Sequence, residues 1–196
     1  MAAKFVPTCA AFAILLATAT RAAAAQALTP LPLRRGEITI RVRVHRFPDF
    51  TARVNADSAA LTGDSLAGAH GVAIARTARI HTGIGPLDGP LRRALGAAEY
   101  PEIRFELLRV RPGATHGDTA AVTYDGRFTI RGRTRDDTIP GTVVLSPGSL
   151  LATATFPLDI RDYGITPPTA LFGIVRVEPV VRVTVRLEFG VATAGR

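Results

Sequence analysis

The dominant pattern along this chain is regular alternation of apolar and polar residues. Between Glu37 and Phe47, isoleucine and valine occupy every second position, and threonine, arginine and histidine mostly occupy the positions between them. Successive side chains of a strand point to opposite faces, so this segment is expected to form a strand with one buried face. The same alternation predicts strands over residues 103–107, 127–131, 152–158 and 181–189.

Weaker alternation predicts two further strands, at Arg53–Ala56 and Val72–Ile80. One short helix is expected to begin at Pro90, because proline suits the first helical turn and Gly96 follows the expected end. Proline and glycine residues predict turns at residues 111–113, 125–126, 146–148 and 166–168.

Seven or eight short strands joined mostly by tight turns predict an all-β domain, either a sandwich or a barrel. A single antiparallel β-barrel of about eight strands with one short helix fits the regular alternation best. The interior of such a barrel is either filled by side chains or holds one ligand. The pattern by itself does not decide between a filled and a hollow interior.

The N-terminal residues follow a different pattern. Lys4 precedes an uncharged run, Phe5–Thr20, and small residues then continue through Ala22–Ala27. This order is typical of a secretory signal peptide, and the run is too short for a comfortable membrane span. We therefore expect residues 1–27 to be a signal peptide and a periplasmic or secreted protein to result. An uncleaved N-terminal anchor is the alternative, because Arg21 interrupts the expected cleavage region.

Residues 28–196 are then expected to form one domain. Cys9 is the only cysteine, so this domain is expected to contain no disulfide, cysteine nucleophile or thiolate metal site. The net charge of +8 becomes +6 without Lys4 and Arg21, and arginine supplies all of its basic residues. Such a basic domain favours transient contact with an anionic membrane surface. The absence of lysine after Lys4 also fits a simple bias toward arginine.

Few residues suggest catalysis. Gly63–Leu66 matches the sequence around a nucleophilic serine, which makes a serine esterase using Ser65 one alternative function. Such a serine needs a histidine base, normally later in the chain, and no histidine follows His116. The histidines lack metal-ligand spacing, so neither a metal nor a cofactor is expected; they are His45, His70, His81 and His116.

Nucleic acid is not an expected partner. The arginines within residues 131–135 and 182–186 have a spacing that could follow phosphates. A nucleic-acid barrel also needs exposed aromatic residues for base stacking. Here the strand phenylalanines share the inward phase of the alternation, and tryptophan is absent.

Four segments together resemble the YceI-like family of periplasmic proteins. His81–Gly85 is similar to the family's Thr-Gly turn before its short helix, and Tyr100–Phe105 to its Tyr-Pro strand start. Asp125–Arg135 is similar to a hairpin segment of the family and Arg161–Ile165 to its Asp-Tyr-Gly corner. The resemblance covers about residues 36–190. Family members usually carry an Arg-Asp-x-His-like cluster after the Thr-Gly turn, of which this chain keeps only Asp88.

The resemblance implies a lipocalin-like barrel that holds a polyisoprenoid or another long-chain lipid, for carriage or sequestration and without catalysis. Arg161, Tyr163 and Thr166 are then candidates for contacts with a polar headgroup at the barrel mouth. The expected apolar ligand contacts are Ile40, Val42, Val44, Phe47, Phe105, Phe128, Ile130, Phe156, Leu158, Phe172, Val183 and Val185. A filled barrel that serves as an interaction module without a ligand is the main alternative. The oligomeric state is left open.

Overall fold

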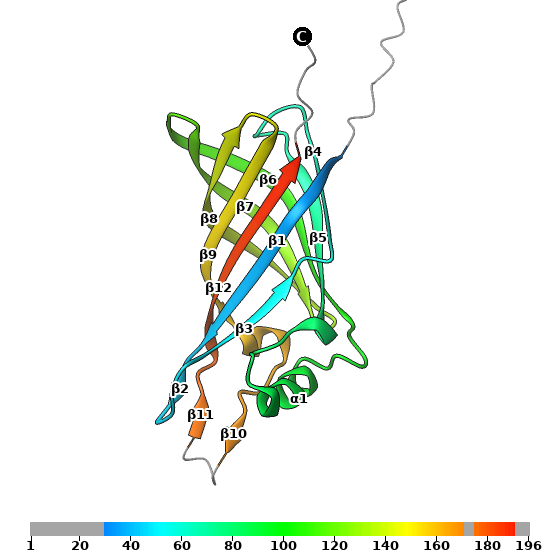
Figure 1. Ribbon diagram of the computed structural model, residues 1–196, viewed down its shortest axis with the longest axis vertical. Helices are drawn as coiled ribbons and strands as arrows, with labels where there is room; N and C mark the ends of the chain where they lie inside the picture. The colour runs from blue at the N-terminus through cyan, green and yellow to red at the C-terminus, as the bar shows by residue number, and fades with distance from the viewer. Residues whose placement is uncertain (1–29, 171–174, 191–196) are drawn as a thin grey trace, which may run out of the picture.

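A computed structural model describes residues 30–170 and 175–190 (Figure 1). The expected signal peptide, residues 1–27, and the expected ligand contact Phe172 lie outside the described residues. The helical elements are η1 (Thr77–Arg79), α1 (Gly85–Ala94) and η2 (Ile160–Tyr163). The strands are β1 (Leu31–Val42), β2 (Val44–His45), β3 (Phe50–Asn55), β4 (Ser58–Thr62), β5 (His70–Arg76), β6 (Glu102–His116), β7 (Thr119–Ile130), β8 (Arg133–Ser146), β9 (Ser149–Asp159), β10 (Thr169–Ala170), β11 (Val175–Val177) and β12 (Val180–Gly190).

The main sheet closes on itself as an antiparallel barrel. Its strands follow the order β12-β9-β8-β7-β6-β5-β4-β1-β3, and β1 also pairs with β12. The other edge of β1 pairs with β4 near Leu31 and with β3 from Glu37 to Val42, so β3 and β4 together occupy one place in the wall. Eight strand positions therefore close the barrel, as the sequence predicts, and the strands run diagonally around it (Figure 1).

The alternation of the sequence becomes the inside and outside of the wall. Along β7, every second residue from Ala120 to Ile130 is buried, and none of the residues between them is buried. The inward residues form the main hydrophobic core, which includes Phe128, Phe156 and Val183. Burial of these side chains is the dominant stabilising contribution in a domain with this architecture.

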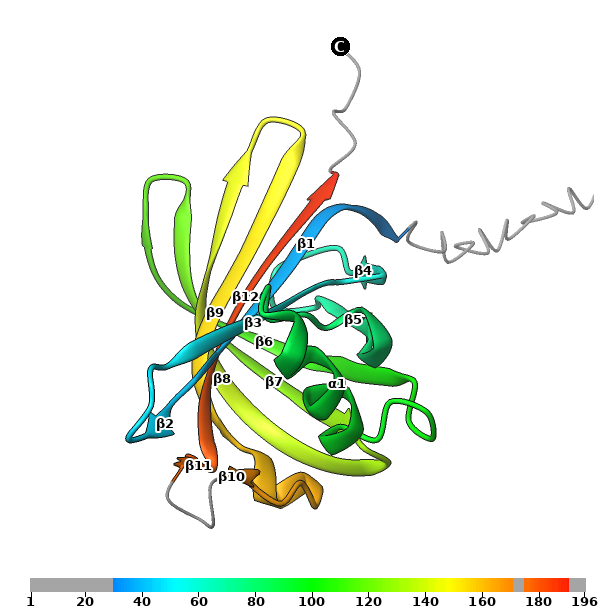
Figure 2. The same cartoon turned by 60° about the horizontal axis from the view of Figure 1, so that its bottom comes forward.

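The wall is incomplete between β3 and β5. Instead of a strand ladder, the Arg53 amide donates to the His81 carbonyl (2.7 Å) and the His81 amide donates to the Arg53 carbonyl (3.0 Å). Helix α1 lies beside this gap, at the same end of the barrel as β2, β10 and β11 (Figure 2). We call this the helix end of the barrel. Leu91 and Leu95 pack against a second core cluster formed by Ala52, Val54, Ala75 and Ile80. Packing of α1 thus replaces strand pairing over this part of the wall.

The helix begins at Gly85, five residues before the expected start at Pro90. Pro86 already occupies the first turn, and Asp88 binds the segment that leads into the helix. Pro90 lies inside α1, where its missing N–H removes the helical hydrogen bond to the carbonyl of residue 86.

Several expected boundaries are also wrong. Residues 111–113 lie within β6, at an irregularity in its pairing with β7, and residues 125–126 lie inside β7 rather than in a turn. The strand expected at Val72–Ile80 ends at Arg76, because the Thr77 amide donates to the Pro101 carbonyl (2.9 Å) and leaves the ladder. The strand expected at Glu37–Phe47 is split between β1 and β2, and Arg46 then turns the chain with a φ of 59°.

Candidate binding cavity

A large apolar cavity of about 640 Å³ occupies the helix end of the barrel. Residues from β1, β3, β5, β6, β7, β9 and β12 form most of its wall, and α1 with its C-terminal cap contributes Leu87, Leu91 and Leu95. Three phenylalanines form a continuous row along this wall. The ring centroids of Phe105 and Phe128 lie 4.6 Å apart, and those of Phe128 and Phe156 lie 5.5 Å apart. The barrel is therefore hollow at this end, and the alternative of a filled barrel does not fit it.

Tyr124 carries the only polar side-chain atom among the described residues that line this cavity. Its hydroxyl donates a hydrogen bond to the Thr142 carbonyl at 2.9 Å. Burial raises the pKa of Tyr124, so the hydroxyl stays protonated at neutral pH. The described part of the wall thus offers a hydrocarbon surface and no uncommitted side-chain donor for a polar headgroup.

The cavity reaches the surface beside the turn that joins β2 to β3. Phe47 lies in this turn, lines the cavity and is nevertheless 59% exposed. A ligand can therefore extend from the interior to solvent at this place. We call this opening the mouth of the large cavity.

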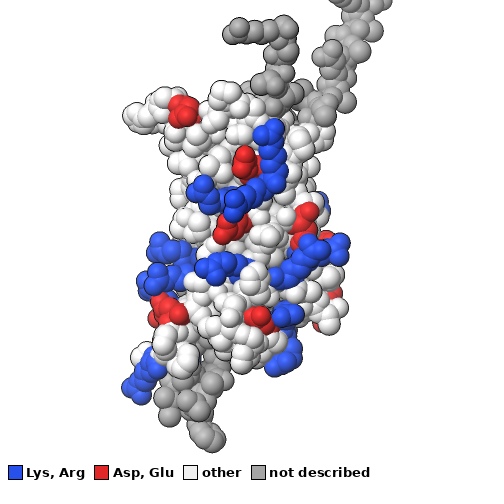
Figure 3. Space-filling model, in the orientation of Figure 1, with Lys and Arg blue, Asp and Glu red and all other residues white. Residues whose placement is uncertain are grey.

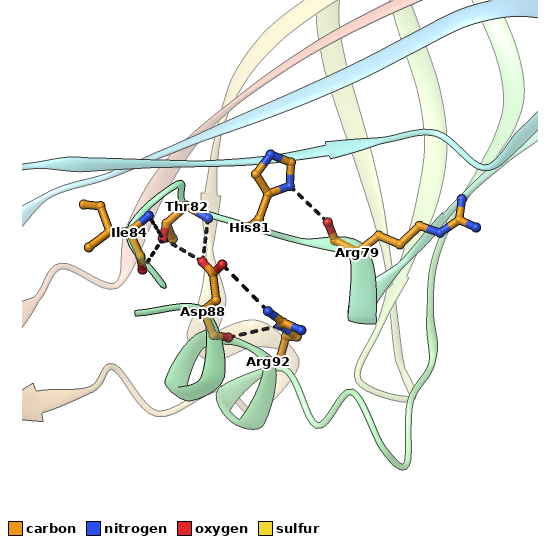
Figure 4. Close-up of polar contacts among 6 residues, drawn as sticks. All are labelled: Arg79, His81, Thr82, Ile84, Asp88 and Arg92. Carbon is orange, nitrogen blue, oxygen red and sulfur yellow. Dashed lines mark hydrogen bonds and ion pairs between the residues drawn. The ribbon is translucent and has the colours of Figure 1, made fainter. Parts of the chain in front are cut away.

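A polar cluster before α1 holds the helix over the cavity (Figure 4). The amide and the hydroxyl of Thr82 both donate to Asp88 Oδ1, each at 2.7 Å. Arg92, one helical turn further on, lies 3.7 Å from the other carboxylate oxygen. The two Thr82 hydrogen bonds lower the pKa of Asp88, which stays ionised at neutral pH. We call this arrangement the Thr82–Asp88 clasp.

The clasp positions the helix and is not part of the cavity wall. None of the six residues drawn in Figure 4 lines the cavity. Arg79 forms an ion pair with Asp57, and its carbonyl lies 3.2 Å from His81 Nδ1. Asp88 therefore connects the segment before α1 to the first turn of the helix.

The structure brings together most of the expected ligand contacts. Arg161 and Tyr163 do not line the large cavity: the Arg161 side chain is 62% exposed and bonded to Asp159, and Tyr163 is buried in η2. Burial raises the pKa of Tyr163 to about 12. Thr166 is exposed and does not line the cavity. Eleven of the expected contacts do line it: Ile40, Val42, Val44, Phe47, Phe105, Phe128, Ile130, Phe156, Leu158, Val183 and Val185.

Sequence reasoning missed the contribution of the helix. Leu87, Leu91, Ala94 and Leu95 all line the cavity. Their spacing of three and four residues is that of one helical face, so an earlier helix start would have identified them.

The segments that carry the family resemblance meet at the helix end and have structural roles there. The Tyr100 ring packs so closely on Gly96 and Gly132 that a Cβ atom at either glycine would lie 2.9 or 2.7 Å from it. Arg131, expected on the polar face of a strand, instead donates to the Gly164 carbonyl from a turn with a φ of 50°. These motifs join the end of β7 to η2 and have structural roles in the fold.

Ser65 lies at the opposite end of the barrel, in the turn before β5. Its hydroxyl donates to Asp64 (3.1 Å) and accepts from the Gly68 amide (3.2 Å). The nearby His70 has its Nδ1 atom 3.1 Å from the Gly68 carbonyl. The described contacts of Ser65 are those of a turn, and they include no histidine base.

Other candidate chemistry is sparse in the part of the chain that the structure describes. No group of three or more His, Cys, Asp or Glu side chains there could hold a metal ion. Nor does any helix within residues 30–170 and 175–190 have the length and apolar character needed to cross a membrane.

Arginines crowd the outer face formed by β1 and β12 (Figure 3). Arg41 and Arg182 face each other directly across the two strands, and Arg43 lies on the same shallow hollow. Asp49 lies 3.4 Å from Arg41, and Glu178 lies 4.0 Å from Arg43. Like charges opposite each other in a sheet are destabilising, and the two carboxylates offset part of this repulsion.

Comparison with solved structures shows barrels of the same shape. A polyisoprenoid binding domain from Saccharophagus degradans superposes with a TM-score of 0.65 at 13% identity, covering 84% of this chain and 99% of that domain. BcnA from Burkholderia cenocepacia gives a TM-score of 0.63 at 16% identity, covering 78% and 95%. The YceI protein of Campylobacter jejuni gives 0.60 at 14%, covering 75% and 88%.

In sequence, no curated protein matches the chain. The family model of the YceI-like domain does match it, over residues 34–189. This match spans the barrel from β1 to β12 and includes the segments that meet around α1. The chain therefore belongs to the YceI-like family.

Proposed function

We propose that this protein is an exported, non-catalytic carrier that holds the tail of a polyisoprenoid or another long-chain lipid in the large cavity. The observation that carries the proposal is an apolar cavity of about 640 Å³ in which the single polar side chain among the described lining residues, that of Tyr124, is already hydrogen-bonded. Ligand sites commonly occupy a few hundred to about 1,000 Å³ and combine apolar walls with a few polar groups. Here the wall is suited to hydrocarbon alone.

Binding energy then comes from the tail. Each methylene removed from water contributes about 0.8 kcal/mol, so a few prenyl units give micromolar affinity even after ordering costs. Among the lining residues that the structure describes, a polar headgroup finds no free side-chain partner, because the Tyr124 hydroxyl is committed to Thr142. The headgroup therefore stays at the mouth, beside Phe47. The solved Saccharophagus degradans domain, which is described as polyisoprenoid-binding, supports this choice of ligand class.

The direct test is to extract the purified protein with organic solvent and identify the extracted compounds by mass spectrometry. The proposal predicts one long-chain apolar compound at close to one molecule per protein. A delipidated sample should also take up geranylgeraniol. If extraction yields no such compound and the delipidated protein binds no prenyl alcohol, the carrier function is wrong.

Export and membrane contact form a separate part of the proposal. Residues 1–27 have the pattern of a secretory signal peptide, and a carrier of lipid between membranes must leave the compartment of synthesis. Arg41, Arg43 and Arg182 provide a basic face for anionic lipid. Cell fractionation with N-terminal sequencing tests the first point. Co-sedimentation with phosphatidylglycerol vesicles, compared with neutral phosphatidylcholine vesicles, tests the second.

A further inference from the structure

A second cavity, of about 340 Å³ and mainly apolar, lies at the opposite end of the barrel, where the turn with Asp64 and Ser65 also lines it. Its lining residues include Leu61, Leu66, Leu150 and Phe189, from β4, the turn before β5, β9 and β12. Leu145 also lines it and is 52% exposed, so this cavity too approaches the surface. No ligand contact was expected from the sequence at this end.

Three residues line both cavities and therefore form the boundary between them: Ala73, Phe105 and Tyr124. Ala73 on β5 directly faces Phe105 on the neighbouring strand β6. The small side chain of Ala73 thus lies next to the Phe105 ring on the adjacent strand of the wall. The width of the boundary depends on where these rings lie.

Both rings lie close against the barrel wall, over inward-facing glycines. A Cβ atom at Gly126 would lie 2.6 Å from Phe105 Cζ, and one at Gly141 would lie 2.5 Å from Tyr124 Cε2. Only glycine permits such a close approach of a ring to the backbone. The hydrogen bond from Tyr124 to the Thr142 carbonyl further fixes the second ring along the wall. The rings therefore border the barrel axis without needing to project across it.

We propose that the far end of the lipid tail passes between these rings and occupies the small cavity, so that the two cavities together select for long chains. This inference rests on the proposed function, since it concerns the same ligand. It assigns the small cavity to the terminal prenyl or alkyl units and the large cavity to the units nearer the headgroup. Chains that end within the large cavity gain nothing from the second one.

Two alanines on β9 offer a matched test. Ala152 lines only the small cavity, and Ala154, the next inward residue on the same strand, lines only the large cavity. Ala152→Phe should fill the small cavity, and Ala154→Phe should fill part of the large one. The two variants add the same side chain to adjacent inward positions, so their general effects on the fold are comparable.

The affinities of the delipidated proteins for farnesol, geranylgeraniol and solanesol, in order of increasing length, separate the outcomes. Ala152→Phe should bind farnesol as the unaltered protein does and should lose about tenfold or more in affinity for solanesol. Ala154→Phe should weaken binding of all three. Unchanged solanesol affinity in a folded Ala152→Phe protein would overturn the inference and leave the carrier function standing. If the unaltered protein binds none of the alcohols, the carrier function itself fails.

A second measurement needs no substitution. A long prenyl alcohol with a diazirine at its tail end is bound to the unaltered protein and photolysed, and the labelled peptides are identified by mass spectrometry. The inference predicts crosslinks at residues that line only the small cavity, such as Leu150 and Phe189. Crosslinks confined to residues that line only the large cavity, such as Ile38 and Leu158, would contradict it.

Discussion

The barrel wall has two unlike halves. The long-strand half consists of β1, β6–β9 and β12, and its ladders are extended: β7 and β8 pair without interruption from Thr119 to Ile130. The short-strand half consists of β3, β4 and β5 with α1. There β4 and β5 pair only from Ser58 to Thr62. Strand β3 pairs with β1 on one edge, but its other edge meets the rest of this half only at the bridge between Arg53 and His81.

The two halves therefore have different roles around the large cavity. The long-strand half supplies a rigid surface on which the phenylalanine row lies. The short-strand half covers the cavity with helix side chains, which are held by packing and by the Thr82–Asp88 clasp rather than by a ladder. Regions with fewer backbone hydrogen bonds open at lower free energy. We therefore expect the barrel to open first beside α1.

The largest effect is expected from a charge placed within the long-strand half. Phe156→Arg would bury a guanidinium group with no partner in the apolar wall, which should lower the free energy of unfolding by at least about 3 kcal/mol. Urea denaturation measures this loss, and organic extraction should show that the lipid is lost. Thr155→Arg, at the neighbouring exposed position, is the control and should change neither property. Equal loss in both variants would argue against an internal cavity.

A direct comparison of the two halves uses one substitution in each. Ile80 beside α1 and Ile139 on β8 are 1% and 3% exposed, and both line the large cavity. Replacing a buried isoleucine by alanine costs about 2–5 kcal/mol, depending on how far the surroundings relax. Ile139→Ala should lie toward the upper end of this range and Ile80→Ala toward the lower end. A larger cost at Ile80, measured by urea denaturation, would show that the α1 side is the more rigid half.

A smaller and local effect is expected from the clasp. Asp88→Ala removes the acceptor of both Thr82 hydrogen bonds, so the amides of α1 should exchange faster with deuterium while those of β7 and β8 do not change. Asp136→Ala, at an exposed carboxylate of β8, is the matched control. Global acceleration by Asp88→Ala would mean that α1 does not open independently of the barrel.

The clasp also has a predictable pH dependence. The folded pKa of Asp88 lies below its usual value of 3.8, so the stabilisation is complete above that pH and is lost as the pH falls through the folded pKa. The difference between the unaltered protein and Asp88→Asn in urea midpoint should therefore be constant from neutral pH down to about pH 5 and shrink below about pH 4.

The smallest effect is expected at Arg161. Its guanidinium is exposed, bonds to Asp159 (2.6 Å) and lies off the cavity wall. Arg161→Ala should leave the affinity for a prenyl alcohol unchanged in an equilibrium binding assay. A strong loss of affinity would place the headgroup at η2 rather than at the mouth beside Phe47.

The barrel could be predicted from the sequence because alternation is a local property. In β7 the apolar or polar character of each side chain indicates whether it faces the interior or the solvent. The expected contacts Phe128 and Ile130 do line the cavity. The local pattern predicts a turn at Gly126, whereas in the structure the glycine leaves room for the Phe105 ring of the neighbouring strand. A requirement set by a neighbouring strand leaves no trace in the local pattern.

The hollow interior could not be predicted for a similar reason. Whether a barrel is filled depends on whether the inward side chains of all strands together occupy the space around the barrel axis. Here small residues at Ala52, Ala73, Ala75 and Ala154 line the cavity. Alanine is frequent throughout this chain, so these four positions were not distinctive in the sequence. Likewise, Arg161 shared a motif with Tyr163, but only the fold shows that both lie off the wall.

The pairing of β1 with β12 has a consequence for folding. The seam joins Leu33 to Phe189 and Arg41 to Arg182, so it brings together the two ends of almost the whole described chain. Contacts between residues so distant in sequence form slowly, since the entropy of closing the loop must be lost before the contact contributes. During synthesis, the barrel therefore cannot close before β12 is made, and apolar side chains of the earlier strands remain exposed to water until then. Loss of this last strand would leave an open, aggregation-prone sheet with no enclosed interior.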